Sequence, residues 1–255
     1  MPSRRPGYSG LTLTPLLELA DACTVVLLDP RGTGGSDRPS SYALDDYVRD
    51  VDQLRAHLEL DQLDLLGHSH GGVVSIAYAA KHPERVRRLV LLGAPVRFSE
   101  EYVAAAQALV QAREREPWFA DAVAAHTRMR AGDYASEEEL SALDRTRFPL
   151  YFGVFDDIAA QYLDGARETR NGDATRAFFN ATSTGSFDLT PLLGEITAPT
   201  LVVAGDSDFV AGPVSARELV DGIGDTRLVL LRDCGHYPFV EQPRALRDAV
   251  LDFLA

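Results

Sequence analysis

The chain is poor in cysteine, in tryptophan and in long apolar runs. Its 255 residues include only Cys23 and Cys234, which form neither a disulfide framework nor a zinc-ribbon spacing, and we expect both to be small buried residues. No uninterrupted apolar run approaches the roughly 18 residues of a membrane span, and the N-terminal basic residues are not followed by the apolar core of a signal peptide. We therefore expect a cytoplasmic protein that does not enter the membrane.

Positive charge is also scarce. Lysine and arginine total 25 against 38 aspartate and glutamate residues, which gives a net charge of -13 and a pI near 4.8. Nucleic acid and anionic membranes would repel such a chain, so neither is expected as a partner. With 45% hydrophobic and 25% charged positions, the chain can bury a full core. We expect one α/β domain with an insertion.

The most informative stretch is 63–74, where an apolar run meets a serine between glycines. Its Gly-His-Ser-His-Gly segment at 67–71 fits the pattern Gly-x-Ser-x-Gly, in which small residues let the backbone bend sharply and expose the serine. Residues 63–66 predict a buried strand and residues 73–80 a helix that packs closely on it. A glycine-rich turn with an incidental serine would explain the short motif alone. The strand and the helix around it favour Ser69 as a nucleophile.

Alternating strand and helix patterns predict a parallel sheet flanked by helices. Apolar runs predict strands at 24–28, 63–66, 88–92, 199–205 and 227–231. Apolar residues at three- and four-residue spacing predict a helix at 44–58. A proline that suits the first helical position predicts a helix at 213–220, and both signals predict one from Pro243 onward.

Between about Val96 and Gly194 the pattern is helical without strands. Ser99 and Ser136 precede acidic residues in the arrangement of helix N-caps. We therefore divide the chain into an α/β core of residues 1–95 and 195–255 and a helical cap insertion of residues 96–194.

Three polar residues follow predicted strands in the order Ser69, Asp208, His236. A serine hydroxyl becomes a good nucleophile when an imidazole accepts its proton, and the imidazole needs a carboxylate to orient it and to stabilise its charge. A lone aspartate after a strand is usually a turn residue, and a lone histidine is usually structural. Their joint placement downstream of the serine favours a catalytic triad.

These features resemble the α/β-hydrolase superfamily, and within it the proline iminopeptidase-like group with a helical cap. The resemblance rests on Asp-x-Arg-Gly-x-Gly-x-Ser at 29–36, on the serine motif, on 199–208, and on Gly-His at 235–236 with Glu241 and Pro243 behind it. It implies that Asp208, the fourth position of Gly-x-x-Asp, is the acid, whereas Asp206 is a turn residue.

The resemblance also implies an oxyanion hole, formed by two backbone N–H groups. One is that of His70, which follows the nucleophile, and the other comes from the N-terminal glycine-rich loop, here near Arg4 or Arg5. The sequence departs from proline iminopeptidases at two places. They usually have Gly-Gly-Ser-Trp-Gly at the nucleophile, where this chain has Gly-His-Ser-His-Gly. Their His-Gly-Gly-Pro-Gly loop is matched here only by Pro-Gly-Tyr-Ser-Gly at 6–10.

An edge hairpin and a central strand of that family have no counterpart at the start of this sequence. We expect the natural start to lie upstream. An inactive relative, or a chain that borrows a strand from a partner, is the alternative.

The His-x-His pair formed by His68 and His70 could suggest a metal site. No Asp-His follows, and no cluster of carboxylates or histidines completes a coordination sphere, so we expect neither a metal nor a cofactor. His68 is expected to pack or hydrogen-bond beneath the turn. An aminopeptidase would need a carboxylate in the insertion for the substrate ammonium, for which the available residues are Glu100, Glu101, Asp156 and Asp157.

The predicted activity is that of a serine hydrolase, which cleaves a small ester, amide or short peptide through an acyl-enzyme, as a monomer or homodimer. One alternative is an aminopeptidase that releases an N-terminal residue. The other is an inactive ligand-binding protein with the same fold, which an organophosphonate would fail to label.

Overall fold

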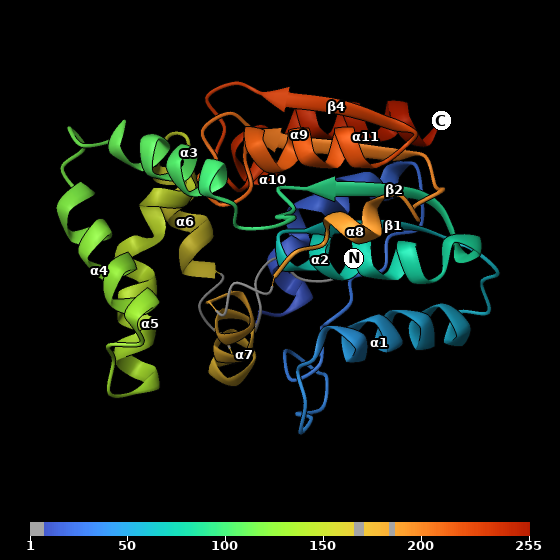
Figure 1. The fold of residues 1–255 in the computed structure, drawn as a ribbon, viewed down its shortest axis with the longest axis horizontal. Coiled ribbons are helices and arrows are strands. Elements are labelled where there is room, and N and C mark those ends of the chain that lie inside the picture. The colour runs from blue at the N-terminus through green and yellow to red at the C-terminus, as the bar shows by residue number, and fades with distance from the viewer. Residues whose placement is uncertain (1–7, 166–170, 184–186) are drawn as a thin grey trace.

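A parallel sheet of four strands lies at the centre of the fold. The computed structural model describes residues 8–165, 171–183 and 187–255. The strands are β1 (Leu63–His68), β2 (Val86–Leu92), β3 (Thr200–Gly205) and β4 (Thr226–Leu231), and they lie side by side in this order (Figure 1). All three pairings are parallel. No strand precedes β1 in residues 8–62, so the predicted parallel sheet is confirmed with β1 at one edge.

Both faces of β1, β2 and β3 are buried because alternate residues of these strands enter two different hydrophobic clusters. In β2, Leu89 and Leu91 join the cluster beneath α1, α2 and α9, whereas Val90 and Leu92 join the cluster on the opposite face. Helices flank the sheet, and two of them, labelled η, are 3₁₀ helices. They are η1 (Gly10–Asp21), α1 (Leu44–His57), α2 (His70–Lys81), η2 (Pro83–Arg85), α8 (Thr190–Leu193), α9 (Pro213–Gly222), α10 (Pro238–Glu241) and α11 (Pro243–Leu254).

All elements described between β2 and β3 are helical, and most of them stand to one side of the sheet (Figure 1). They are α3 (Glu100–Gln111), α4 (Phe119–Ala131), α5 (Glu137–Arg147), η3 (Phe148–Tyr151), α6 (Asp157–Gly165), α7 (Gly172–Ser183) and α8. The predicted N-caps are confirmed: Ser99 accepts from the N–H of Tyr102, and Ser136 accepts from that of Glu139. The last of these helices, α8, packs against α2 and α9.

Two predictions about the N-terminal region are wrong. Residues 24–28 are not part of the described sheet. Their apolar side chains explain the error, because Val25, Leu27 and Leu28 pack against the two hydrophobic clusters, and an apolar run reports burial rather than strand pairing. Cys23 is exposed, whereas Cys234 is buried as expected.

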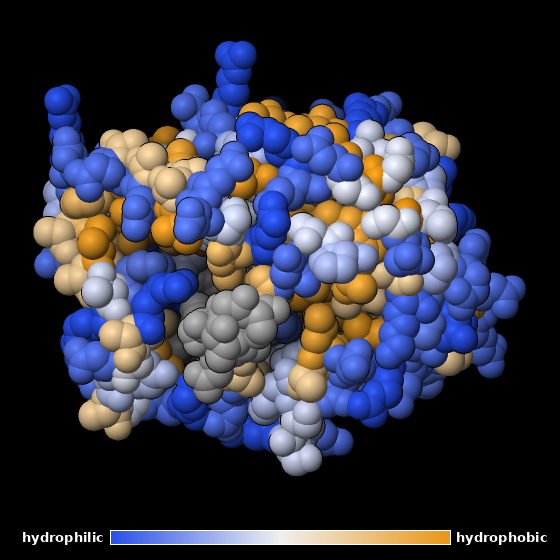
Figure 2. Space-filling model, viewed as in Figure 1, coloured by the Kyte–Doolittle hydropathy of each residue, from blue (hydrophilic) through white to orange (hydrophobic). Residues whose placement is uncertain are grey.

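Hydrophilic residues predominate on the face of the molecule seen in Figure 2. Figure 2 shows charged and polar residues over most of one face, with hydrophobic residues visible at the β4 edge, where Leu228 and Leu230 are exposed. None of the helices in the described ranges is long and apolar enough to cross a membrane.

Candidate active site

Ser69 occupies a sharp turn between β1 and α2. Its backbone has φ 53° and ψ −119°, a conformation that non-glycine residues rarely adopt and that stores strain. The flanking glycines allow the tight packing: a Cβ on Gly67 would lie 2.4 Å from the carbonyl oxygen of Gly71, and one on Gly72 would lie 2.4 Å from the Cβ of Ala94. The strand, turn and helix predicted around the serine are therefore confirmed.

His236 and Asp208 form a buried hydrogen-bonded pair. The His236 Nδ1 lies 2.8 Å from the Asp208 Oδ2, and each residue is 1% exposed. The other carboxylate oxygen accepts the N–H groups of Val210 and Ala211 at 2.8 and 3.2 Å, which fixes its orientation. A carboxylate acceptor places the imidazole proton on Nδ1. The buried Nε2 has no hydrogen-bond partner in the described chain and is thus left as a base.

Asp206, the neighbouring acid, lies outside this pair. Its carboxylate accepts from the Ser207 hydroxyl at 3.0 Å, and its N–H donates to the Leu231 carbonyl. The structure therefore joins Asp208, and not Asp206, to the histidine.

Two backbone contacts fix the position of His236. Its N–H donates to the Tyr151 carbonyl, and its own carbonyl lies 2.6 Å from the Nε2 of His68. Because a carbonyl can only accept, the proton of His68 is on Nε2 in this contact. The prediction that His68 packs or hydrogen-bonds is confirmed, since its side chain is fully buried and makes this hydrogen bond.

Glu241 holds the loop that carries His236. Its carboxylate accepts the N–H groups of Gly235 and Tyr237, on either side of the histidine, and that of Gly153 at 2.7 Å. Burial raises the pKa of Glu241 to about 7, against the lowering effect of these three donors, and nearby Asp208 adds to the rise. Sequence analysis noted Glu241 only as part of a motif, so its clamping contacts were missed.

Gly93, directly after β2, lies against the buried pair. Its φ is +48°, and a Cβ at this position would lie 3.1 Å from Asp208 Oδ2 and 3.2 Å from His236 Nδ1. Sequence analysis predicted the strand at 88–92 but did not single out the glycine that follows it. A glycine at a strand end was the signal that could have identified it.

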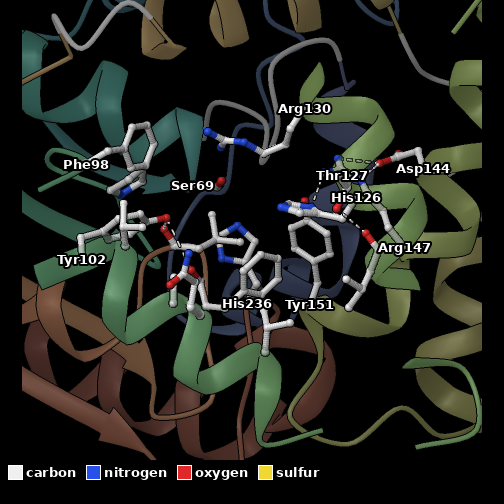
Figure 3. A pocket seen from close by; sticks show the side chains of 18 of the residues that line it. Ser69, Phe98, Tyr102, His126, Thr127, Arg130, Asp144, Arg147, Tyr151 and His236 are labelled. Carbon is white, nitrogen blue, oxygen red and sulfur yellow. Dashed lines mark hydrogen bonds and ion pairs between the residues drawn. The ribbon is translucent and has the colours of Figure 1, made fainter. Parts of the chain in front are cut away.

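Ser69 and His236 both face a cavity of about 890 Å³ (Figure 3). One part of the wall is apolar and consists mainly of Phe98, Tyr102, Val103, Ala106, Val110, Val123, Tyr151 and Phe209. Another part is polar and includes Tyr8, His126, Thr127, Arg130, Asp144 and Arg147. The segment between β2 and β3 therefore supplies most of the wall, while the segments that follow β1 and β4 supply the serine and the histidine.

The polar part of the cavity contains a buried ion pair. Asp144 and Arg147 are 5% and 3% exposed, and the Arg147 Nη2 lies 2.7 Å from the Asp144 Oδ1. The Tyr8 hydroxyl donates to the other oxygen of Asp144. The Arg147 guanidinium also lies 5.2 Å from the centre of the Tyr151 ring. These contacts fully engage the Asp144 carboxylate.

The other candidate residues have different positions. His70 is the first residue of α2, and its ring lies edge-on to Tyr47 with centroids 5.0 Å apart. Burial lowers the pKa of His70 to about 4, so the ring is neutral at pH 7. Arg5 and Arg4 lie outside the described residues.

None of the four acidic residues considered for a substrate ammonium lies in the cavity wall. They are Glu100, Glu101, Asp156 and Asp157. No group of three histidine, cysteine or acidic residues suited to a metal occurs within the described ranges.

The comparison with protein families decides the classification. The protein-family model described as "alpha/beta hydrolase fold" matches residues 8–243 of the chain. The chain belongs to the α/β-hydrolase family. Residues 1–7, in which part of the family resemblance was sought, lie outside this match.

Named relatives of this α/β-hydrolase are themselves hydrolases. It is 31% identical over 227 residues to the proline iminopeptidase PfmaB of Pestalotiopsis fici, with 88% of this chain and 79% of the relative covered. It is 30% identical to the 2-hydroxymuconate semialdehyde hydrolase of Pseudomonas sp. strain CF600, with 93% and 78% covered. The crystal structure of the enol-lactonase from Burkholderia xenovorans LB400 superposes with a TM-score of 0.73 at 26% identity, with 99% and 89% covered.

The predicted α/β-hydrolase fold and the resemblance to proline iminopeptidases are thus confirmed. The chain is an enzyme that hydrolyses ester, amide or peptide bonds.

Proposed function

We propose that this α/β-hydrolase is a serine hydrolase with Ser69 as nucleophile, His236 as general base and Asp208 as the acid that orients the base. The observation that carries the proposal is the buried Asp208–His236 pair, whose Nε2 is left without a partner in the described chain while His236 lines the same cavity as Ser69. The strained backbone of Ser69 supports it, since such strain concentrates at functional sites.

The reaction is an acyl transfer to water in two steps. In the first, Ser69 Oγ bonds to the carbonyl carbon while its proton passes to His236 Nε2, and that proton then leaves with the alcohol or amine as the ester or amide bond breaks. In the second, a water molecule gives a proton to Nε2 and attacks the acyl-enzyme. The proton returns to Ser69 Oγ as the acid is released.

The oxyanion formed in each step requires N–H donors. The N–H of His70 is suited to this role, because it follows the nucleophile and belongs to the first turn of α2, where helix amides are not used by the helix ladder. The second predicted donor, at Arg5, stays a prediction. A cytoplasmic location and a monomeric or homodimeric state also stay predictions, as does the division into core and cap.

The test is hydrolysis of p-nitrophenyl hexanoate and of aminoacyl p-nitroanilides by the purified protein. Ser69→Ala should abolish turnover and labelling by a fluorophosphonate. Asp208→Asn should lower kcat by about 10⁴-fold, whereas the matched variant Asp206→Asn should stay within about two-fold of wild type. Full activity in Ser69→Ala, or equal losses in the two aspartate variants, would overturn the proposal.

The alternative function is that of an aminopeptidase, which the similarity to the proline iminopeptidase PfmaB supports. The ratio of ester to anilide turnover tests it. The cavity contains no carboxylate beyond the engaged Asp144 in its described lining, and this observation favours the broader ester or amide activity.

A further inference from the structure

Arg130 is an exposed arginine that lines the cavity and has no ion-pair partner among the described residues. It lies in the last turn of α4, and Figure 3 shows its side chain extending from that helix toward the cavity that Ser69 and His236 face. It makes no hydrogen bond or ion pair in the part of the chain that the structure describes. The pKa of the half-buried Tyr102, another lining residue, is raised by burial and by Asp208 and partly lowered by the charge of Arg130. A guanidinium keeps this charge at every working pH.

The other charges in the wall do not offset Arg130. Asp144 is the only carboxylate among the described lining residues, and Arg147 and the Tyr8 hydroxyl already hold it. The described lining therefore carries one surplus positive charge, in a chain whose net charge is -13. A substrate ammonium would approach the like charge of Arg130 and would find no available carboxylate.

We propose that the cavity takes substrates that bear a carboxylate remote from the bond to be cleaved, and that Arg130 binds this carboxylate. The substrate class is then the monoesters or monoamides of dicarboxylic acids. A guanidinium can bind a carboxylate with two parallel hydrogen bonds. The apolar wall formed by residues such as Phe98, Tyr102 and Val110 suits the hydrocarbon spacer between the two ends. This inference rests on the proposed function, because it assigns Ser69 to the reacting end.

The test compares p-nitrophenyl esters of adipic, hexanoic and 6-aminohexanoic acid, which share one chain length but end in a carboxylate, a methyl and an ammonium group. After subtraction of spontaneous hydrolysis, kcat/KM should be roughly 10-fold higher for the adipate ester than for the hexanoate ester, and lowest for the ammonium ester. Raising the salt concentration should reduce this preference, since salt screens partly exposed charges.

Arg130→Gln should lower kcat/KM for the adipate ester by roughly 10- to 100-fold and leave the hexanoate ester within about two-fold. Arg130→Glu should reverse the order in favour of the ammonium ester. Arg145→Gln is the matched control: Arg145 is also an exposed arginine in the last turn of a helix, α5, without an ion pair among the described residues, but it does not line the cavity. Its variant should keep the wild-type preference.

A second measurement separates this inference from the proposed function. Calorimetry on Ser69→Ala protein should detect binding of adipate but not of 6-aminohexanoate, and the added change Arg130→Gln should remove it. Adipate binding that depends on Arg130, without Ser69-dependent hydrolysis of any ester, would support the carboxylate site and refute the mechanism. Failure of adipate to bind, or an equal loss on all three esters in Arg130→Gln, would overturn the carboxylate site.

Discussion

Gly93→Ala is the substitution that tests the described geometry most directly. The added methyl group would lie 3.1 Å from Asp208 Oδ2 and 3.2 Å from His236 Nδ1, whereas ordinary contacts of this kind are about 3.5 Å or longer. The pair must therefore move by about 0.4 Å. Alanine must also adopt a φ of +48°, which costs about 1–2 kcal/mol of folding free energy.

The movement should be visible in turnover. A misplacement of 1 Å can cost about 10²-fold in rate, so a shift of a few tenths of an ångström corresponds to roughly a 4- to 10-fold fall in kcat. The assay is hydrolysis of p-nitrophenyl hexanoate, which carries no charge that Arg130 could bind. Urea denaturation of the same preparation measures the loss of stability.

Gly132→Ala is the control for backbone strain. Gly132 ends α4 with φ +69°, and nothing lies within 4 Å of a Cβ placed there. Both variants should therefore lose about 1–2 kcal/mol in stability, but only Gly93→Ala should lose turnover. Equal turnover in the two variants would show that the contact between Gly93 and the pair does not constrain the catalytic geometry, and the reasoning would be refuted.

Three further outcomes concern stability and pH. Arg147→Met leaves the buried Asp144 carboxylate without its cation, and the unfolding free energy in urea should fall by about 3–5 kcal/mol; a fall below about 1 kcal/mol would contradict a buried pair. Ser136→Ala removes the acceptor of the Glu139 N–H and should cost about 1 kcal/mol with kcat unchanged. The pKa of Glu241 is about 7 in the folded protein and near 4.5 when unfolded, so the folded state holds the proton longer. Its stabilising contribution is complete below about pH 4.5 and declines, by about 3 kcal/mol at most, as the pH rises to about 7. Glu241→Gln cannot ionise and should remove this decline from a plot of unfolding free energy against pH; parallel curves for the two proteins would contradict the raised pKa.

The sequence by itself determined the local structure around Ser69 and most of the sheet. The predicted strand at 88–92 is found at Val86–Leu92, and the one at 227–231 is found at Thr226–Leu231. The caps at Ser99 and Ser136 were equally predictable. These features depend on residues close together in the chain, through apolar periodicity, glycine in tight turns and side chains that accept helix N–H groups. The strand predicted at 24–28 failed because strand pairing needs a neighbour that an apolar run does not specify.

Only the tertiary structure decided which polar groups meet. Glu241 accepts the N–H of Gly153, 88 positions away, and the Tyr8 hydroxyl reaches Asp144 across 136 positions. In the sequence alone, Asp144 is one of many acidic residues, and Arg130 resembles other arginines at a helix end. Folding buries the first together with Arg147, three positions away on the same helix, and leaves the second without an ion pair among the described residues that line the cavity. The sequence offered no way to tell a buried carboxylate from a solvated one, because burial arises from contacts between distant segments, such as that of Tyr8 with Asp144.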